Sequence, residues 1–203
     1  MTDPNLRELT LDILYEILEQ DGYSHRVLSA VLEKYQYLEK QQRAFITRVV
    51  QGTMERLITI DAVLDRFVKK PKVAKMKPLI RTLLRESVYQ ILYMDYVPDS
   101  AVCNEAVKLA RKRGFSGLSG FVNGVLRNIA REKEQIRFEG WSETYAMPQW
   151  IIDQWLAVYP KEQVREMLEA LLMEKKTCVR VNLRRITRED LSLRLQARGI
   201  GVE

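Results

Sequence analysis

Clustered lysine and arginine side chains are the groups in this chain whose type and spacing could do chemistry, and that chemistry is phosphate binding. Eight of them fall within twenty residues, with Asp65 as the acid beside them: Arg66, Lys69, Lys70, Lys72, Lys75, Lys77, Arg81 and Arg85. Residues 65–137 carry 16 Lys and Arg against 7 Asp and Glu, a net charge of +9, and the segments on both sides are acidic. Basic blocks on one face of a fold bind phosphates by Coulomb attraction and counterion release. The other interpretation is that these lysines only keep a helical protein in solution.

Further cations lie outside this cluster. Residues 111–113 end a predicted helix, where positive charge also stabilises the helix dipole, so a structural role is as good an interpretation as a binding one. A second basic block covers residues 174–203, which carry 8 Lys and Arg against 4 Asp and Glu. Aromatic residues are rare among these cations, so we expect contacts to phosphates and to RNA shape rather than base stacking. The predicted RNA-binding residues are Arg66, Lys69, Lys70, Lys72, Lys75, Lys77, Arg81, Arg111, Lys112, Arg113, Arg127, Arg180, Asn182 and Arg184.

The nucleophiles and bases of the sequence do not assemble into a catalytic centre. Cys103 and Cys178 lie in helix-like and strand-like contexts, where we predict structural roles, with Cys178 a buried small hydrophobic residue. His25 is the single histidine, lacks a serine–acid arrangement, and is expected at a helix start. The glycine run over residues 114–120 joins two helices rather than a strand and a helix, so it does not indicate a phosphate loop. We therefore predict no catalytic, cofactor-binding or metal-binding residue in this chain.

The composition predicts a soluble cytoplasmic protein without a membrane partner. The chain of 203 residues is 46% hydrophobic and 30% charged, as in ordinary globular proteins. Its N-terminus, MTDPNLRELT, lacks the apolar core of a secretion signal, and charged residues interrupt every apolar helix. Two distant cysteines form no disulfide framework, which favours a reducing compartment.

A hydrophobic period of 3.6 residues predicts helices along most of the chain. Gly52 lies inside one of them at a cost of about 1 kcal/mol relative to alanine, which indicates that another helix crosses closely there. Ser24 is expected to cap the second helix. The segment 76–94 is apolar on most sides and is expected to be the central helix of a bundle. The expected helices cover residues 6–18, 24–35, 45–60, 61–68, 76–94, 99–113 and 121–131.

The period lapses over residues 137–147, and the character of the chain then changes. Two more helices are expected within residues 148–172, and a last one, capped by Thr187, over 187–198. Residues 177–183 alternate and are rich in β-branched side chains, which predicts a strand, and residues 200–203 look like the beginning of another. A single strand has no ladder partner, so we expect the chain to be cut within a small α+β unit.

Several strings of this sequence resemble the antiterminator NusB family, in the variant fused to Sun/Fmu-type 16S ribosomal RNA cytosine-C5 methyltransferases. Residues 5–137 resemble the NusB part, and residues 145–200 resemble the connector that leads into the methyltransferase part. The matching strings are FITRVVQG (45–52), ESVYQIL (86–92), YMDYVP (93–98), NEAVKLARK (104–112) and GFVNGVLRNIAR (120–131).

The resemblance implies an all-α, NusB-like helical bundle over residues 1–139 and a helical connector over residues 140–175. It places the truncated strand–helix start of a small α+β domain at residues 176–203. It also implies a missing methyltransferase domain that uses S-adenosylmethionine and a cysteine thiolate that attacks C6 of cytosine. The present chain would be inactive alone and would hold folded 16S ribosomal RNA for its own C-terminal methyltransferase domain.

The alternative function comes from a different class of protein. The chain could be a complete NusB-like module that binds RNA and protein partners in transcription antitermination or termination, without any chemistry. The segment 145–203 argues against this alternative, since a free-standing module would not need an unpaired strand.

Overall fold

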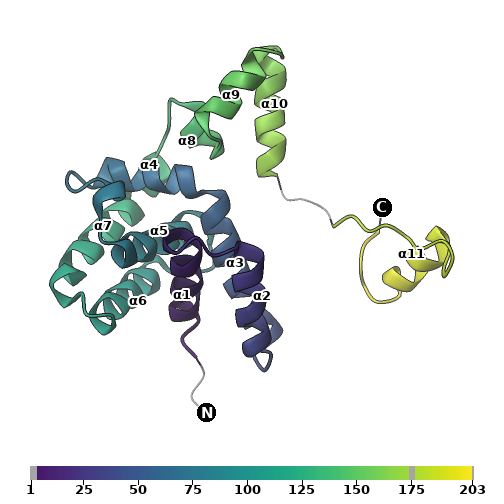
Figure 1. Ribbon diagram of the computed structural model, residues 1–203, viewed down its shortest axis with the longest axis horizontal. Coiled ribbons are helices and arrows are strands. Elements are labelled where there is room, and N and C mark those ends of the chain that lie inside the picture. Colours follow the sequence, from purple (N-terminus) through teal and green to yellow (C-terminus); the bar gives the residue numbers. More distant parts are fainter. Residues whose placement is uncertain (1–3, 174–176, 203) are drawn as a thin grey trace. The chain divides into compact units, whose positions relative to one another are not determined.

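The computed structural model describes residues 4–173 and 177–202, and the chain divides into two compact units, 1–168 and 169–203 (Figure 1). Short 3-10 turns lie at Val73–Lys75, Ser116–Leu118 and Lys133–Gln135. The helices are α1 (Leu6–Glu19), α2 (Ser24–Lys34), α3 (Lys40–Glu55), α4 (Leu57–Phe67), α5 (Pro78–Tyr93), α6 (Asp99–Lys112), α7 (Ser119–Glu132), α8 (Trp141–Tyr145), α9 (Gln149–Leu156), α10 (Lys161–Leu172) and α11 (Arg188–Gln196).

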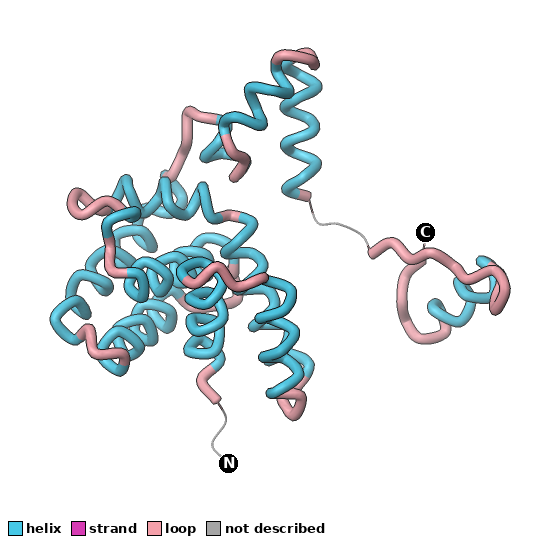
Figure 2. The backbone as a smooth tube through the Cα atoms, in the orientation of Figure 1, coloured by secondary structure: helices cyan, strands magenta, loops and turns pink. Residues whose placement is uncertain are grey.

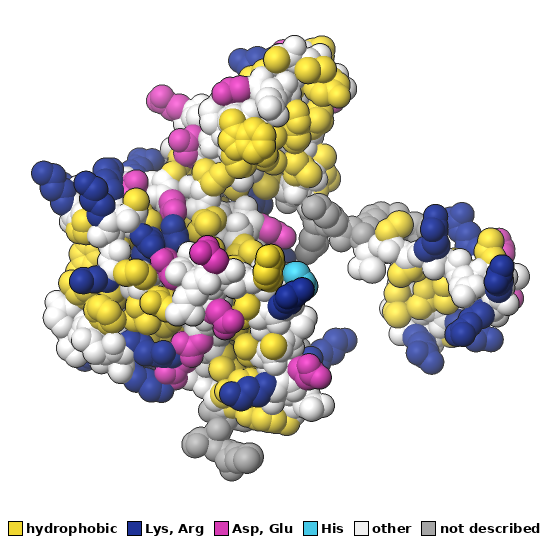
Figure 3. Space-filling model, viewed as in Figure 1, with side chains coloured by type: hydrophobic (Ala, Val, Ile, Leu, Met, Phe, Trp, Pro, Cys, Tyr) yellow, Lys and Arg dark blue, Asp and Glu magenta, His cyan; other side chains and the backbone are white. Residues whose placement is uncertain are grey.

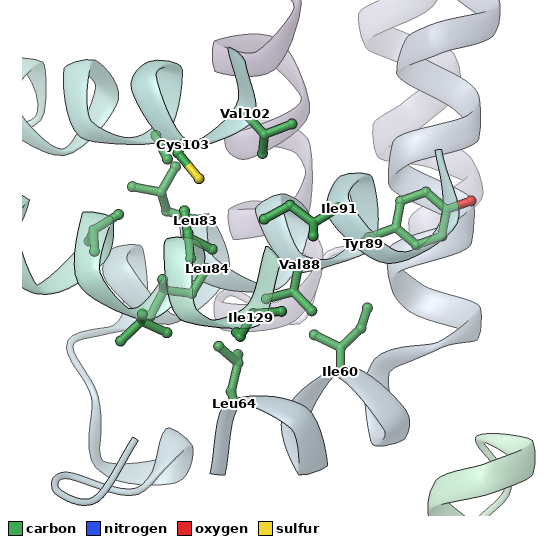
Figure 4. Close-up of a cluster of buried hydrophobic side chains, with 14 of the residues drawn as sticks. Ile60, Leu64, Leu83, Leu84, Val88, Tyr89, Ile91, Val102, Cys103 and Ile129 are labelled. Atoms are coloured by element: carbon green, nitrogen blue, oxygen red, sulfur yellow. The ribbon is translucent and has the colours of Figure 1, made fainter. Parts of the chain in front are cut away.

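Helix α5 is the central helix of the bundle, as its apolar sequence predicts. It packs against α1, α3, α4, α6 and α7. Leu83, Leu84 and Val88 along it are completely buried, and Figure 4 shows them in the main core beside Leu64 of α4 and Ile129 of α7. Because each of these helices buries an apolar stripe against α5, the central helix fixes where α4, α6 and α7 present their polar faces.

Gly52 of α3 marks the close crossing that the sequence predicts. A Cβ atom on Gly52 would lie 2.0 Å from the Cζ and Oη atoms of Tyr89 on α5. Real Cβ atoms essentially never lie this close to another atom, so a larger residue here would require the Tyr89 ring to move, which explains a glycine inside the helix. Figure 4 shows Tyr89 at the edge of the core cluster that contains Val88 and Ile91.

Two smaller clusters complete the first unit. Ile13, Leu28 and Ile46 belong to a cluster of α1, α2 and α3 side chains. A third cluster, centred on Ile152, Val164 and Leu168, lies in the α8–α10 segment. Helix α8 is joined to the bundle where the Thr59 hydroxyl of α4 donates to the Glu143 carbonyl at 2.6 Å.

Three local predictions about the helices are wrong. No helix was expected over residues 137–147, where α8 forms. The continuous helix expected over 45–60 is interrupted at Arg56, which adopts φ −104° and ψ 14° between α3 and α4. The Arg56 guanidinium then lies over the Tyr93 ring, 5.1 Å from its centroid. Ser24 does not cap α2 but is its first residue, and Tyr23 is the N-cap.

The C-terminal unit departs from the sequence prediction in its strands, because neither residues 177–183 nor residues 200–202 form one. Residues 177–183 form no strand, and no strand occurs anywhere in the described residues (Figure 2). A ladder needs a second strand to accept and donate its hydrogen bonds, and the described part of the chain offers none. Helix α11 forms as expected, with the Thr187 hydroxyl accepting from the Asp190 amide at 3.1 Å. The predicted domain boundaries at 139 and 175 stay predictions, and residues 1–3, 174–176 and 203 lie outside the described residues.

Candidate nucleic-acid interface

The connection between α4 and α5, residues 68–77, presents a dense set of cations and is called the lysine loop below. Its Lys69, Lys70, Lys72, Lys75 and Lys77 side chains are all exposed. Dark blue side chains project from the bundle at the upper left of Figure 3, where this loop lies in Figure 1. Within residues 4–173 and 177–202, no hydrogen bond or ion pair is found for any of these ammonium groups except that of Lys72.

The shape of the lysine loop is fixed by hydrogen bonds to its backbone. Asp65 accepts from the Val73 amide at 2.8 Å through its carboxylate. The Lys72 ammonium donates to the Asp65 carbonyl at 3.0 Å, and the Arg81 guanidinium donates to the Ala74 carbonyl at 2.9 Å. The backbone of the lysine loop is therefore fixed. The side chains of Lys69, Lys70, Lys75 and Lys77 stabilise no part of it in the described residues.

Arg66 lies at the start of this region and is exposed. Its guanidinium donates to the Arg137 carbonyl at 3.3 Å, which ties the end of α4 to the segment before α8. The cation remains open to solvent on its other side, so it adds to the field of the lysine loop.

Arg81 and Arg85, by contrast, form ion pairs that join helices of the bundle. Arg81 forms a two-pronged ion pair with Glu19 of α1, and only 6% of the Glu19 side chain is exposed. Arg85 donates to Asp61 of α4 at 2.6 Å. The hydrogen bond that Arg81 donates to Glu19 raises the pKa of Arg81 above its ordinary value. The geometry gives Arg81 the task of joining α5 to α1.

Lys112 and Arg113 at the end of α6 are likewise paired with α1. Lys112 lies 2.6 Å from a carboxylate oxygen of Glu8, and Arg113 lies 2.6 Å from one of Asp12. The hydrogen bond to Asp12 raises the pKa of Arg113 above its ordinary value. Both cations are therefore largely neutralised by α1.

Helices α6 and α7 enclose a surface hollow of about 450 Å³ that is open to solvent. It brings Arg111 and Arg127 together, as two predicted binding residues from different helices. Sequence reasoning missed its other polar members, although their spacing of three or four residues on each helix placed them on one face. The lining residues are Asn104, Val107, Lys108, Arg111, Ser119, Gly120, Asn123 and Arg127.

In the C-terminal unit, Arg180, Asn182 and Arg184 are exposed. The Asn182 side chain accepts from the Arg184 amide at 3.1 Å and so stabilises a turn. The shared face that alternation would give these residues is not formed, because the strand is not formed.

The two cysteines differ in burial. Cys103 is buried among core side chains, and burial raises the pKa of its thiol, which disfavours the reactive thiolate. Cys178 is exposed, so the prediction that it is buried is wrong. Among the described residues, no group of three or more His, Cys, Asp and Glu could hold a metal ion, and no helix is long and apolar enough to cross a membrane.

Two family profiles match consecutive segments of the chain. The profile of the NusB family matches residues 4–131. The chain belongs to the NusB family. Residues 147–203, beyond the NusB region, match the ferredoxin-like domain described as Methyltr_RsmF/B-like. The family indicated by the sequence strings is therefore confirmed.

The relatives of the NusB region are of two kinds. The probable ribosomal RNA small subunit methyltransferase B of Bacillus subtilis (strain 168) is 33% identical over 211 residues, covering 100% of this chain and 46% of that protein. The transcription antitermination protein NusB of Lysinibacillus sphaericus (strain C3-41) is 34% identical over 128 residues, covering 63% of this chain and 95% of that protein. The chain therefore spans about half the length of the methyltransferase relative.

Solved structures share the fold. A crystal structure of the antitermination factors NusB and NusE in complex with dsRNA aligns with a TM-score of 0.57 at 19% identity, over 62% of this chain and 93% of that chain. At that identity the likeness concerns the NusB fold alone. It agrees with the all-helical bundle built around α5.

Proposed function

We propose that this chain is the RNA-binding N-terminal region of an S-adenosylmethionine-dependent 16S ribosomal RNA cytosine-C5 methyltransferase of the cytoplasm, and that it positions folded RNA for its own C-terminal domain. The similarity to the Bacillus subtilis methyltransferase over the whole chain supports this assignment. So does the match of residues 147–203 to a domain named for methyltransferases.

The observation that carries the RNA-binding role is the lysine loop. Its ammonium groups are exposed and mostly unpaired in the described structure, while the loop backbone is held by Asp65 and Arg81. Because the loop backbone is already held, phosphate binding has to order only the lysine side chains, and each contact releases counterions. Such contacts set the register and orientation of RNA rather than read its sequence.

Methyl transfer itself is assigned to the rest of the parent protein. The glycines at 114, 117 and 120 lie at the junction of α6 and α7, whereas S-adenosylmethionine is usually cradled by a glycine-rich turn between a strand and a helix. This glycine run therefore does not fit this cofactor. The chain contributes binding and orientation.

The similarity to a free-standing NusB protein favours a second candidate function. Over 128 residues the Lysinibacillus sphaericus protein is as similar as the methyltransferase, so the bundle could act in antitermination or termination. That relative covers 63% of this chain, whereas the methyltransferase covers 100% of it. The methyltransferase assignment accounts for more of the sequence.

Binding of transcribed 16S ribosomal RNA to the 203-residue chain, followed by fluorescence anisotropy, tests the proposal. We expect saturable binding that weakens steeply with salt, and a preference for 16S ribosomal RNA over a transfer RNA of similar charge density. Absence of saturable binding at low salt would show that the RNA-binding role is wrong.

A further inference from the structure

The α6–α7 hollow has the chemistry of a nucleotide site that goes beyond general phosphate attraction. We infer that it binds one unpaired nucleotide of an RNA, with the phosphate held between Arg111 and Arg127 and the base edge facing Asn104 and Asn123. The inference deepens the proposed function and rests on it, since it names a subsite for the same RNA.

The positive charge of the hollow is concentrated, and two of its three cationic side chains have no partner in the described residues. Three of its lining side chains are cations, and no acid lines it. Lys108 is partly neutralised by Glu105 at 3.3 Å. In the described part of the chain, the guanidinium groups of Arg111 and Arg127 have no ion pair or hydrogen bond, and both residues are exposed. Two guanidinium groups facing one hollow would repel each other unless an anion lay between them.

The cations next to Arg111 on α6 have partners, whereas Arg111 has none in the described residues. Lys112 and Arg113 directly follow Arg111, and both are paired with carboxylates of α1. Helix α6 therefore divides its C-terminal charge between two faces. One face stabilises the bundle through α1, and the other, with Arg111, turns its charge to the hollow.

The start of α7 adds to the attraction for an anion. Leu118 is the N-cap of α7 and supplies no side-chain hydrogen bond to the first turn. Ser119 and Gly120 of that turn line the hollow. The positive end of the α7 dipole therefore lies at the Ser119 and Gly120 end of the hollow, where it favours an anion.

The two asparagines distinguish a nucleotide from a bare phosphate. Asn104 of α6 and Asn123 of α7 line the hollow from opposite helices, and no hydrogen bond is found for either amide in the described structure. An anion needs donors only, whereas a carboxamide offers a donor and an acceptor side by side, which matches the edge of a base. Val107 supplies an apolar contact between them.

The size and openness of the hollow fit this occupant. A volume of about 450 Å³ lies within the range of small-molecule sites, and the hollow opens to solvent so that a continuous RNA strand could pass. A base paired in a duplex has its Watson–Crick edge engaged, and the deep major groove of RNA hides the other edge. The hollow therefore takes an unpaired nucleotide.

Single arginine substitutions in the 203-residue chain test the inference against a matched control. Arg111→Ala and Arg127→Ala remove one charge each from the hollow. Arg131→Ala removes one charge from the same helix as Arg127, at an exposed residue that does not line the hollow. With a fluorescein-labelled single-stranded RNA, we expect each hollow variant to weaken binding about fivefold and the control variant to change it less than twofold.

Nuclear magnetic resonance of the side-chain amides supplies a second readout. The single-stranded RNA should shift the Asn104 and Asn123 amide resonances, and these shifts should disappear in Arg111→Ala. Duplex RNA and inorganic phosphate should leave the amide resonances close to their free positions.

The outcomes separate the inference from the proposed function. If the hollow variants bind RNA like Arg131→Ala while lysine-loop variants weaken binding, the hollow is not a subsite but the proposed function stands. If phosphate alone or duplex RNA shifts the two amides as far as single-stranded RNA does, a nucleotide site is excluded. If the unaltered chain binds no RNA, both the inference and the proposed function are wrong.

Discussion

Thr10 of α1 and Glu86 of α5 are in direct contact inside the bundle, with Thr10 Oγ1 and Glu86 Oε2 2.9 Å apart. Only 1% of Glu86 is exposed. Thr10 Oγ1 also lies 2.9 Å from the Arg7 carbonyl oxygen, and its single hydrogen cannot serve both acceptors. A protonated Glu86 resolves this conflict, because its own hydroxyl can donate to Thr10. Burial raises the pKa of Glu86 to about 8, in agreement with a neutral carboxyl group at pH 7.

This pKa predicts how the stability of the bundle depends on pH. The folded chain holds a proton on Glu86 between about pH 4.5 and about pH 8, whereas the unfolded chain releases it. The free energy of unfolding should therefore fall as the pH rises through this range, by about 3 kcal/mol between pH 4.5 and pH 7.

Glu86→Gln is neutral at every pH, so its free energy of unfolding, measured with urea, should depend less on pH. Glu16→Gln, at an exposed site of α1, serves as the control. A Glu86→Gln protein with the unaltered pH dependence would contradict the assignment.

The crossing of α3 and α5 predicts opposite effects for two glycine substitutions. Gly52→Ala should lower the free energy of unfolding by about 1–3 kcal/mol, because the Tyr89 ring must move. Gly124→Ala, inside α7 with nothing within 4 Å of the new Cβ, should raise it by about 0.5–1 kcal/mol. Thermal unfolding of both variants measures this difference. Equal changes in the free energy of unfolding of the two proteins would mean that the close approach of Tyr89 to Gly52 does not affect stability.

Arg111 and Arg113, two residues apart on α6, should separate stability from binding. Arg113→Ala removes the contacts to Glu8 and Asp12 and should lower the free energy of unfolding by up to about 1 kcal/mol, less at high salt. Arg111→Ala should leave stability unchanged and weaken RNA binding. Urea unfolding at low and high salt, together with RNA titration, measures both quantities. The account of α6 is wrong if Arg111→Ala is the variant that unfolds more easily.

Helices α1–α7, α9 and α10 could be predicted from the sequence because each carries its own apolar stripe, and α11 from the Thr187 cap, whereas α8 was not predicted. The central position of α5 and the close crossing at Gly52 followed from such local evidence. The interruption at Arg56 could not be predicted, since arginine is a good helix former. The prediction of a strand at 177–183 was wrong because it used only local evidence. Its local pattern is that of a strand, but a strand exists only with a partner.

The candidate site could be predicted in part. The lysine loop is evident from composition, because its cations are contiguous. The pairing of Arg81 with Glu19, 62 residues away, is invisible to sequence spacing. The same holds for Arg113 and Asp12, which are 101 residues apart. The α6–α7 hollow needed the relative placement of two helices before Asn104 and Asn123 could be seen to face one site.

Two pairs of Lys→Glu substitutions should distinguish RNA binding by the lysine loop from attraction by the net charge of the protein. Lys69→Glu with Lys70→Glu leaves untouched the Lys72 bond that shapes the loop, and should weaken binding to 16S ribosomal RNA about tenfold or more. Lys34→Glu with Lys40→Glu makes the same change in net charge at two exposed lysines near α2 and α3, and should weaken it much less. Anisotropy titrations at one salt concentration compare the two pairs. Equal reductions in affinity would indicate that net charge alone governs binding.

The salt dependence of RNA binding by the Lys69→Glu, Lys70→Glu and Lys75→Glu variant, which keeps the Lys72 bond to Asp65, tests the central claim most directly. If the lysine loop binds phosphates, the slope of log affinity against log salt should flatten by about 0.7–0.9 for each lysine–phosphate pair that the variant removes, and affinity should fall alike for all RNA sequences. Circular dichroism should show unchanged helicity, because these side chains lie outside the core. An unaltered slope with unchanged helicity would contradict the claim and would indicate that the lysines of the loop only keep the protein in solution.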